Sequence, residues 1–423
     1  MELQLPKGTR DFAPEEKIVR DKIVSTLKEV FELYGFAPLE TPVLERFDIL
    51  SSKYAGGAEI LKETFRLKDQ GERELGLRYD LTVPMCRYIG MNPNLKLPFK
   101  NYRMGEVFRD GPIASARYRQ FTQCDPDIVG SSSMASDAEI ISLIDAAFKK
   151  FEIEIKIKIN SRKLLNNVLD YCGIEKEKQD AAILSIDKLE KFGMTVVKNE
   201  MKQQRIDESK INKILGIISI KGNNDEKIFQ LKNFLKDSEG LDEIGQLLDY
   251  LKNTAIDCEL DVSLARGLSY YTGTVIETFL KNSNVKSAVC AGGRYDNIIG
   301  SFLDKGSYPA VGVSFGVDRI YDAIIEKQEN KIKTNTKIYI IPIKTINESI
   351  RIAQQLRDAG INSDIDLMEK GPSKNLEYAN SLAIPYALFV GSKELQEGKL
   401  KLRNMKTGKE EMIGIDEVIG KLK

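Results

Sequence analysis

The chain has 423 residues, of which 42% are hydrophobic and 30% are charged. This length suits two or three domains, and this composition is typical of folded proteins and not of disordered chains. The 63 basic and 63 acidic residues cancel, so a nucleic acid could be bound only through local basic clusters. No apolar run reaches the ~18 residues that span a bilayer, and the N-terminus lacks the apolar core of a signal peptide. We therefore expect a cytoplasmic protein without a membrane segment.

Histidine is missing from the composition. This excludes Ser-His-Asp and Cys-His nucleophiles, acid–base catalysis by imidazole, and metal sites with histidine ligands. The cysteines form no Cys-x-x-Cys pair, so we expect buried thiols, without a disulfide framework or a metal site. The usual glycine-rich phosphate loops are also missing. A bound nucleotide would therefore have to be held by other groups.

The first element predicted along the chain is an amphipathic helix over 15–34, which Gly35 ends. Residues 36–45 are predicted to be extended, at a sheet edge or an interface, because they contain Pro38 and Pro42. The elements predicted next are a hairpin within 60–90 with a helix after Thr82, two strands flanking a loop at 109–116, a helix at 137–152 and a strand at 152–159.

The composition then shifts to Lys, Glu, Leu and Ile with helical periods between about 165 and 255, which predicts a helical insertion. Strands are predicted again at 259–279 and 286–300, followed by a helix that starts near Gly316. The polar stretch 326–336 is the predicted linker. The remaining segments alternate strand and helix, which predicts a small α/β domain: strand 337–343, helix 346–359, strand 362–367, helix 373–383 and strand 386–391.

The segment 117–130 carries the clearest chemical signal. If it is a strand, its odd-numbered residues share one face. Such a face is a poor core and a good floor for a ligand, although a solvent-facing strand with ordinary salt bridges is the alternative. Arg109 adds a guanidinium group that could grip phosphate oxygens in bidentate fashion. The residues on the predicted face are Arg117, Arg119, Phe121, Gln123, Asp125 and Asp127.

Three further arginines stand next to glycines or aromatic residues. Arg266 precedes the pair Tyr270–Tyr271, Arg294 follows paired glycines in a predicted strand, and Arg319 lies in the first turn of a predicted helix. Each signal alone is usually structural. Together they predict a nucleotide held on an antiparallel sheet by guanidinium groups.

These segments resemble the class II aminoacyl-tRNA synthetases, and specifically the histidyl-tRNA synthetase family. The dipeptide Tyr79-Asp80 and the phrase QCDPDI at 123–128 look like the archaeal and eukaryotic branch. The motifs that carry the resemblance are LPKGTRDF (5–12), FAPLETPVLE (36–45), FRDGPIASARYRQF (108–121), RGLSYYTGTVIE (266–277), AGGRYD (291–296) and PAVGVSFGVDRI (309–320).

The resemblance implies an α+β fold: an antiparallel class II catalytic core over 1–325 with the helical insertion, and a small α/β anticodon-binding domain over 337–423. It implies ATP-dependent ligation of L-histidine to histidine tRNA through a histidyl-adenylate, with release of AMP and pyrophosphate. ATP would be a substrate accompanied by Mg²⁺. A homodimer is also implied, with the 36–45 segment and the preceding helix at the interface.

The resemblance also implies residue roles. The α-ammonium group would be held by Asp80, Thr82 and Gln123, and the imidazole nitrogens by Asp127 and Tyr271. Arg266 would act at the α-phosphate and the attacking carboxylate. The complete implied sets are, for catalysis, Arg266, Arg109 and Gln123; for histidine, Asp80, Leu81, Thr82, Gln123, Asp127, Arg266, Tyr270 and Tyr271; and for ATP, Arg109, Arg117, Phe121 and Arg319, with Phe121 stacked on adenine.

One departure from the family pattern is Ser269, where most members carry aspartate. The alternative reading is the synthetase-like regulatory subunit of ATP phosphoribosyltransferase, which is a binding protein on the same fold. That subunit typically lacks the C-terminal domain and has lesions in the arginine motif. The presence of Arg266 and of residues 337–423 favours the synthetase.

Overall fold

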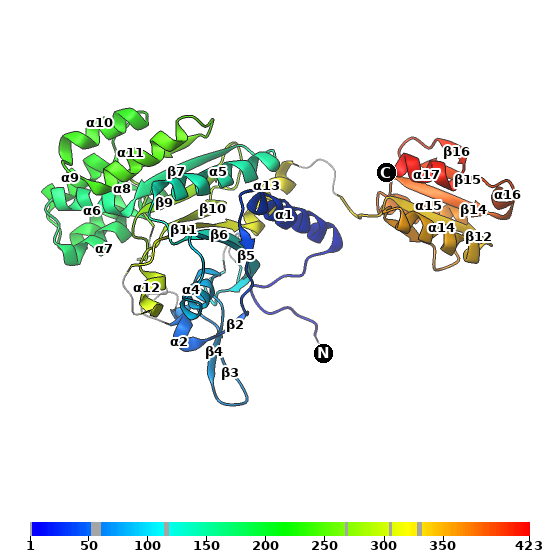
Figure 1. The fold of residues 1–423 in the computed structure, drawn as a ribbon, viewed down its shortest axis with the longest axis horizontal. Coiled ribbons are helices and arrows are strands. Elements are labelled where there is room, and N and C mark those ends of the chain that lie inside the picture. The colour runs from blue at the N-terminus through cyan, green and yellow to red at the C-terminus, as the bar shows by residue number, and fades with distance from the viewer. Residues whose placement is uncertain (1, 52–60, 114–117, 267–269, 304–306, 328–331) are drawn as a thin grey trace. The chain divides into compact units, whose positions relative to one another are not determined.

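The computed structural model describes residues 2–51, 61–113, 118–266, 270–303, 307–327 and 332–423. These residues form two compact units, one containing the described residues of 22–327 and the other containing residues 332–423 (Figure 1). None of the helices in the described ranges combines the length and the apolar character that crossing a membrane requires.

A sheet of eight strands forms the centre of the first unit. Its strands are β1 (Ala37–Pro38), β5 (Phe99–Phe108), β6 (Gln120–Val129), β7 (Ile155–Ser161), β8 (Cys258–Leu260), β9 (Thr274–Leu280), β10 (Cys290–Arg294) and β11 (Ala310–Gly316). They lie in the order β1-β5-β6-β11-β10-β9-β7-β8. Neighbours from β5 to β7 pair antiparallel, whereas β1 pairs parallel to β5 and β8 pairs parallel to β7. The predicted antiparallel core is therefore present.

One face of this sheet is covered by two long helices, α1 (Pro14–Leu33) and α5 (Met134–Lys150). The ring of Phe315 on β11 lies 5.5 Å from Phe31 of α1 and 6.0 Å from Phe148 of α5, centroid to centroid. All three rings are fully buried. Successive strand residues point to opposite faces, so the neighbours of Phe315 in the pleat face the uncovered side. That side is where polar residues can meet a ligand.

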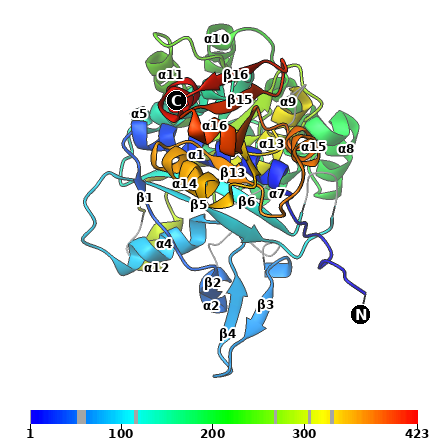
Figure 2. The same cartoon turned by 90° about the vertical axis from the view of Figure 1, so that its right-hand side faces the viewer.

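A smaller antiparallel sheet projects from the first unit (Figures 1 and 2). Its strands are β2 (Leu44–Arg46), β3 (Arg66–Lys68) and β4 (Glu74–Leu77), in the order β2-β4-β3. The short helix α2 (Phe47–Leu50) follows β2, and α4 (Thr82–Met91) follows β4. Helix α4 shares an apolar cluster with α12 (Ile298–Leu303), in which Met85 and Ile299 are fully buried. This packing fixes the start of α4 beside the large sheet.

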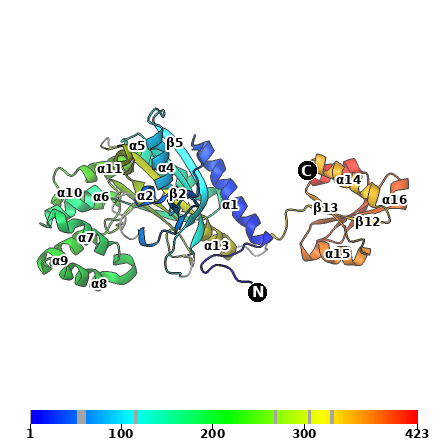
Figure 3. The ribbon, with the colours of Figure 1, turned by 90° about the horizontal axis from the view of Figure 1, so that it is seen from below.

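Helices fill the segment between β7 and β8 and gather at one end of the unit (Figures 1 and 3). They are α6 (Arg162–Tyr171), α7 (Lys176–Ile186), α8 (Leu189–Gln203), α9 (Glu208–Ile218), α10 (Asn224–Phe234) and α11 (Glu239–Leu251). Helix α8 is kinked at Gly193, whose φ of 78° suits glycine. These helices occupy the segment between about 165 and 255 that was predicted to be helical. Helix α13 (Val317–Lys327) then ends the first unit.

The second unit is a five-stranded sheet with helices on both faces. Its elements are β12 (Ile338–Ile343), α14 (Ile346–Asp358), β13 (Ser363–Ile365), α15 (Pro372–Ser381), β14 (Tyr386–Gly391), α16 (Ser392–Gln396), β15 (Leu400–Asn404), β16 (Glu410–Ile413) and α17 (Ile415–Leu422). The strand order is β13-β12-β14-β15-β16, parallel among the first three and antiparallel beyond β14. Two apolar clusters, one around Ile340 and one around Ile341, pack on opposite faces. The predicted α/β alternation is confirmed.

Two strand predictions were wrong in extent. The strand predicted at 259–279 is interrupted after β8, where the Asp261 carboxylate accepts hydrogen bonds from the N–H and the hydroxyl of Ser263 and makes a turn. The strand predicted at 286–300 is only β10, because the chain turns at Asp296 and enters α12. Alternation of apolar and polar residues predicts a strand, but it does not show where a side chain bonds to the backbone and turns the chain.

Candidate active site

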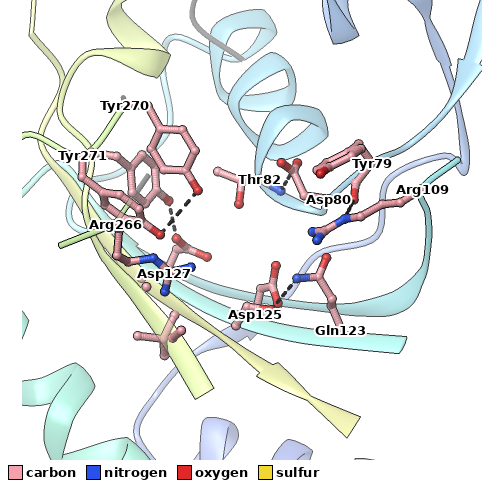
Figure 4. Close-up of a pocket in the computed structure, with 16 residues that line it drawn as sticks. Tyr79, Asp80, Thr82, Arg109, Gln123, Asp125, Asp127, Arg266, Tyr270 and Tyr271 are labelled. Carbon is pink, nitrogen blue, oxygen red and sulfur yellow. Dashed lines mark hydrogen bonds between the residues drawn. The ribbon is translucent and has the colours of Figure 1, made fainter. Parts of the chain in front are cut away.

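A cavity of about 150 Å³ lies over the uncovered face of the large sheet (Figure 4). Its lining comes from β6, β10 and β11, from the segments before α4 and before β9, and from Arg109 just after β5. The lining residues are Tyr79, Asp80, Thr82, Arg109, Gln123, Asp125, Asp127, Arg266, Tyr270, Tyr271, Ala291, Gly292, Tyr295, Gly312, Val313 and Ser314.

Alternate residues of β6 form the floor of the cavity. Gln123, Asp125 and Asp127 point to the same side and are at most 8% exposed. On the neighbouring strand β11, Gly312 stands opposite Asp127, and a Cβ at that position would overlap the carboxylate. Gly312 therefore leaves space for the carboxylate of Asp127 on the floor of the cavity. Arg119, which was expected on the same face, precedes the strand, and its Nη2 lies 3.1 Å from a carboxylate oxygen of Asp110.

Two buried partners fix Asp127. Nη2 of Arg103 on β5 donates to Oδ2, and the hydroxyl of Tyr295 donates to Oδ1. Arg103 is 2% exposed, so its charge compensates a buried carboxylate that would otherwise be costly to desolvate. Burial, together with the charge of Asp127, raises the pKa of Tyr295, so this phenol keeps its proton and remains a donor.

Tyr270 and Tyr271 form the wall above Asp127 (Figure 4). Their ring centroids are 4.6 Å apart and their hydroxyl groups are 3.5 Å apart. The guanidinium carbon of Arg266 lies 5.4 Å from the Tyr271 ring centroid, and its Nη1 lies 3.6 Å from Oε1 of Glu277. That Nη1 is buried and has no hydrogen-bond partner among the described residues. Arg266 lines the cavity beside Tyr271 and brings a positive charge to this wall.

Asp80 lies at the opposite end of the cavity and caps α4. Its Oδ1 accepts the N–H of Thr82 at 3.0 Å and of Val83 at 2.9 Å. These bonds favour the charged carboxylate, but burial outweighs them and raises the pKa of Asp80. Leu81, which was expected at the histidine site, is fully buried and does not line the cavity.

Arg109 is sandwiched between two aromatic rings at the mouth of the site. Its guanidinium carbon lies 4.2 Å from the Tyr79 ring centroid and 4.9 Å from that of Phe121. Burial lowers the pKa of Arg319, and the charges of Arg109 and Arg266 lower it further. Positive charge from Arg109 and Arg266 thus reaches Arg319. Such an arrangement suits a polyphosphate ligand.

Two of the other expected ATP residues lie outside the cavity. Phe121 and Arg319 do not line it, and Arg319 donates to the carbonyl oxygen of Ala288 at 2.5 Å. Arg117 and the departure at Ser269 fall outside the described residues.

Sequence reasoning missed Arg103 and Tyr295 as parts of the site. Tyr295 follows Arg294 in the AGGRYD segment, and the prediction for that segment used only its glycines and its arginine. Arg294 itself was expected to help hold an anion. Instead it is 2% exposed, pairs with Asp137 on α5, and does not line the cavity.

Comparisons with known proteins match both parts of the chain to described families. The family model described as Histidyl-tRNA synthetase matches residues 8–320, and the one described as Anticodon binding domain matches residues 337–423. This chain belongs to the histidyl-tRNA synthetase family. Histidine–tRNA ligase 1 of Bacillus cereus (strain ZK / E33L) is 43% identical over 418 residues, which cover 97% of each chain.

Solved structures support the same assignment of fold. The histidyl-tRNA synthetase from Nostoc sp. PCC 7120 matches with a TM-score of 0.88 and 29% identity, covering 100% of this chain and 99% of that one. A protein from Bacillus halodurans C described as an ATP phosphoribosyltransferase regulatory subunit/histidyl-tRNA synthetase matches with a TM-score of 0.76 and 21% identity, covering 90% and 97%. At that identity the likeness shows the fold alone. The predicted class II α+β fold with a C-terminal anticodon-binding domain is confirmed.

The expectation of an archaeal or eukaryotic branch is not supported, because these relatives within the histidyl-tRNA synthetase family are bacterial, Bacillus prominent among them. The prediction of that branch rested partly on Asp127. In the structure its carboxylate accepts hydrogen bonds from Arg103 and Tyr295, a local role that does not identify a branch of the family.

Proposed function

We propose that this chain ligates L-histidine to histidine tRNA in the cytoplasm, through a histidyl-adenylate, with release of AMP and pyrophosphate. The observation that carries this proposal is one cavity that combines imidazole partners with guanidinium groups. Asp127 and Tyr271 offer an acceptor and a hydroxyl at one end, where Arg266 lies beside Tyr271, and Arg109 offers a second guanidinium group beside Tyr79 at the other (Figure 4). Family membership over nearly the whole chain supports the same activity.

The imidazole end accounts for selectivity. A neutral imidazole has one donor and one acceptor nitrogen. Asp127, held by Arg103, would accept from the first, and the Tyr271 hydroxyl would donate to the second. An apolar amino acid of similar size would leave these buried groups unpaired, and such sites discriminate by ~10⁴ or more.

The arginines account for activation. An oxygen of the histidine carboxylate forms a bond to the α-phosphorus of ATP as the bond to pyrophosphate breaks, so negative charge gathers between two anions. The protein's task is positioning and charge stabilisation. We assign Arg266 to the reacting groups and Arg109, Arg117 and Arg319 to the phosphates, with Phe121 stacked on adenine. ATP enters as its Mg²⁺ complex.

Transfer to tRNA requires no imidazole from the protein. A ribose hydroxyl attacks the adenylate carbonyl, and the substrate's phosphate oxygen can take the proton as AMP leaves. We assign residues 1–325 to this chemistry, 326–336 to a linker and 337–423 to anticodon binding, which the matching domain family supports.

We also propose a two-fold homodimer. Leu33 at the end of α1 is 76% exposed, and Val43 and Leu44 near β2 are 39% and 47% exposed. Leu33 precedes the 36–45 segment and Val43 and Leu44 lie within it, and burial against a second copy would remove these apolar side chains from water. Sedimentation velocity at micromolar concentration should give twice the monomer mass, and a persistent monomer would contradict the proposal.

The decisive experiment is ATP–pyrophosphate exchange measured with each of the twenty amino acids. Exchange should depend on histidine alone. Exchange with a different amino acid would overturn the substrate assignment. If none supports exchange in a folded protein, the regulatory-subunit alternative would replace the enzyme.

A further inference from the structure

The N-terminal segment LPKGTRDF (5–12) lies against the stem of the loop that follows Arg109. This stem closes where the backbone N–H of Arg109 donates to the carbonyl oxygen of Arg119 at 2.8 Å. The N–H of Arg119 in turn donates to the carbonyl oxygen of Gly8, also at 2.8 Å. Gly8 has a φ of 86°, and a Cβ there would lie 2.8 Å from Cγ of Arg119, so glycine suits this close approach. The N-terminal segment therefore supports the stem.

Arg10, two residues after Gly8, binds two groups at once. Its Nη2 lies 2.6 Å from Oδ1 of Asp318, and its Nη1 donates to the hydroxyl of Tyr118 at 3.2 Å. Its guanidinium carbon lies 4.2 Å from the centroid of the Tyr118 ring. The side chain of Arg10 is 26% exposed and that of Asp318 is 8% exposed, so this ion pair is shielded more than a surface pair. An arginine that is bonded to two partners and stacked on a ring is held in one geometry.

One partner of Arg10 belongs to helix α13. Asp318 lies in the first turn of that helix, directly before Arg319. Its second carboxylate oxygen, Oδ2, accepts the backbone N–H of Thr122 on β6 at 3.4 Å. Asp318 thus joins the start of α13 to β6 with one oxygen and to Arg10 with the other. Because Arg319 is the next residue, a movement of Asp318 would move Arg319 with it.

The other partner, Tyr118, belongs to the stem that holds Arg109. Arg109 and Arg319 are two of the arginines that we assign to the phosphates of ATP. Burial lowers the pKa of Arg319, and the charge of Arg109 lowers it further. Like charges favour a wider separation when no anion lies between them. A bond between the two supports of these arginines would oppose that separation.

We propose that Arg10 is a positioning residue that links α13 to the stem of the 109–119 loop, and so holds Arg319 and Arg109 at the spacing that ATP requires. Arg10 does not line the cavity, so it acts through its two partners and not by contact with histidine. Groups that are already in place lose less freedom when the ligand binds, which favours binding. This inference rests on the proposed function, in which the two arginines bind the phosphates.

The first test compares Arg10→Met with wild type in histidine-dependent ATP–pyrophosphate exchange and in equilibrium binding of each substrate. Methionine keeps an apolar side chain but removes the charge and the donors. The kcat/KM for ATP should fall by ~10- to 100-fold, the cost of misplacing a group that positions the reactants, and the Kd for ATP should rise. The Kd for histidine should stay within about twofold, because Arg10 lies outside the cavity.

Arg73→Met is the matched control, because the exposed Arg73 pairs with Asp69 at 2.7 Å and lies outside the cavity. This control should match wild type. An equal loss of affinity for ATP and histidine in Arg10→Met would make Arg10 a general structural residue, and unchanged kinetics with ATP would also overturn the proposal. If wild-type protein binds ATP but shows no exchange with histidine, the proposed function fails instead, and the Kd of Arg10→Met for ATP still tests the link.

The second test asks whether Arg10 acts through Asp318. Asp318→Asn keeps an oxygen that can accept the N–H of Thr122 but removes the charge that Arg10 binds. In this background, Arg10→Met should lower kcat/KM for ATP by less than about threefold, since the effects of coupled residues are not additive. If Arg10→Met costs as much in this background as in wild type, Arg10 does not act through Asp318 and the proposed link is wrong.

Discussion

The chemistry of this site depends on individual charged side chains that are buried from water. Arg266 has a buried Nη1 without a hydrogen-bond partner among the described residues, and Asp127 is held between Arg103 and Tyr295. Low local dielectric strengthens such groups when a ligand arrives and makes them costly when it is absent. Substitutions here should therefore alter binding and rate in separable ways.

Arg266→Ala should reduce histidine-dependent pyrophosphate exchange by at least ~10²–10³-fold, the usual effect of losing one transition-state donor. Because the charge that it stabilises develops only during attack, the affinities for histidine and ATP should change much less. Exchange kinetics with equilibrium binding of each ligand separate these effects. A variant with a near-normal exchange rate would make Arg266 a structural residue.

Asp127→Asn should weaken histidine binding by ~1–3 kcal/mol, because a neutral amide would mispair with the imidazole and leave the buried Arg103 without its counter-charge. Discrimination against other amino acids should fall along with affinity, while bound histidine is still activated. Calorimetry and exchange with near-cognate amino acids measure the two effects. Unchanged affinity would move the imidazole to another part of the cavity.

Asp125→Asn should also change the pH dependence of stability in the ligand-free protein. Burial raises the folded-state pKa of Asp125 to about 7, from its ordinary value of about 4. The stability contributed by the retained proton is thus complete below about pH 4 and is lost as the pH rises to about 7. The variant does not titrate, so its advantage in Tm over wild type should grow across that window and then level off. If the difference in Tm between the variant and the wild type did not change with pH, the pKa of Asp125 would be the same in the folded and unfolded states.

The residues of the site were only partly predictable. The sequence led to Asp80, Gln123, Arg109, Asp127 and Arg266, and the cavity brings these together. It did not lead to Arg103, because the proximity of Arg103 to the β6 carboxylates depends on the register of β5 against β6, which a single sequence leaves open.

At the scale of elements, buried polar links fix how helices meet the sheet. Arg294 at the end of β10 donates to the carbonyl oxygens of Ser131 at 2.9 Å and Ser133 at 3.3 Å, and pairs with Asp137 in α5. These bonds hold the start of α5 against β10. The helix and strand patterns predicted both elements but not the link, since nothing in the AGGRYD segment says which face its arginine occupies.

Arg294→Met should destabilise the first unit by ~3–5 kcal/mol, because it leaves Asp137 buried without a counter-charge. The double variant Arg294→Met, Asp137→Leu should recover much of that loss, since the uncompensated charge is then gone. Urea unfolding of both variants measures the difference. If the single variant loses less than about 1 kcal/mol, the pair does not link β10 to α5 in the way described.

At the scale of the whole molecule, the assigned chemistry and the anticodon-binding family match lie in different units. The cavity is lined entirely by residues before 315, and the second unit has apolar clusters of its own. A unit with its own core can fold alone. The division into catalytic and anticodon-binding parts can therefore be tested by separating them.

A fragment that ends at Lys327 should retain histidine-dependent pyrophosphate exchange within severalfold of the full chain. Aminoacylation should show a raised KM for tRNA, because anticodon contacts would contribute binding and not chemistry. Fragment 332–423 should unfold cooperatively by itself. If exchange collapses in the fragment that ends at Lys327 while it remains folded and retains the oligomeric state of the full chain, this division of labour is wrong.

The parallel pairing of β8 with β7 limits how far the helical insertion could be shortened. Antiparallel neighbours can be joined by a two-residue turn, but parallel neighbours need a crossover of a dozen or more residues, usually helical and right-handed. Helix α11 precedes β8, contacts α5 and β7, and buries Ile244 and Leu247. Helix α11 is therefore suited to be the crossover that the parallel pair β7 and β8 requires. An ancestral or engineered chain could lack α7 to α10 and still close this edge of the sheet, whereas a chain without α11 could not.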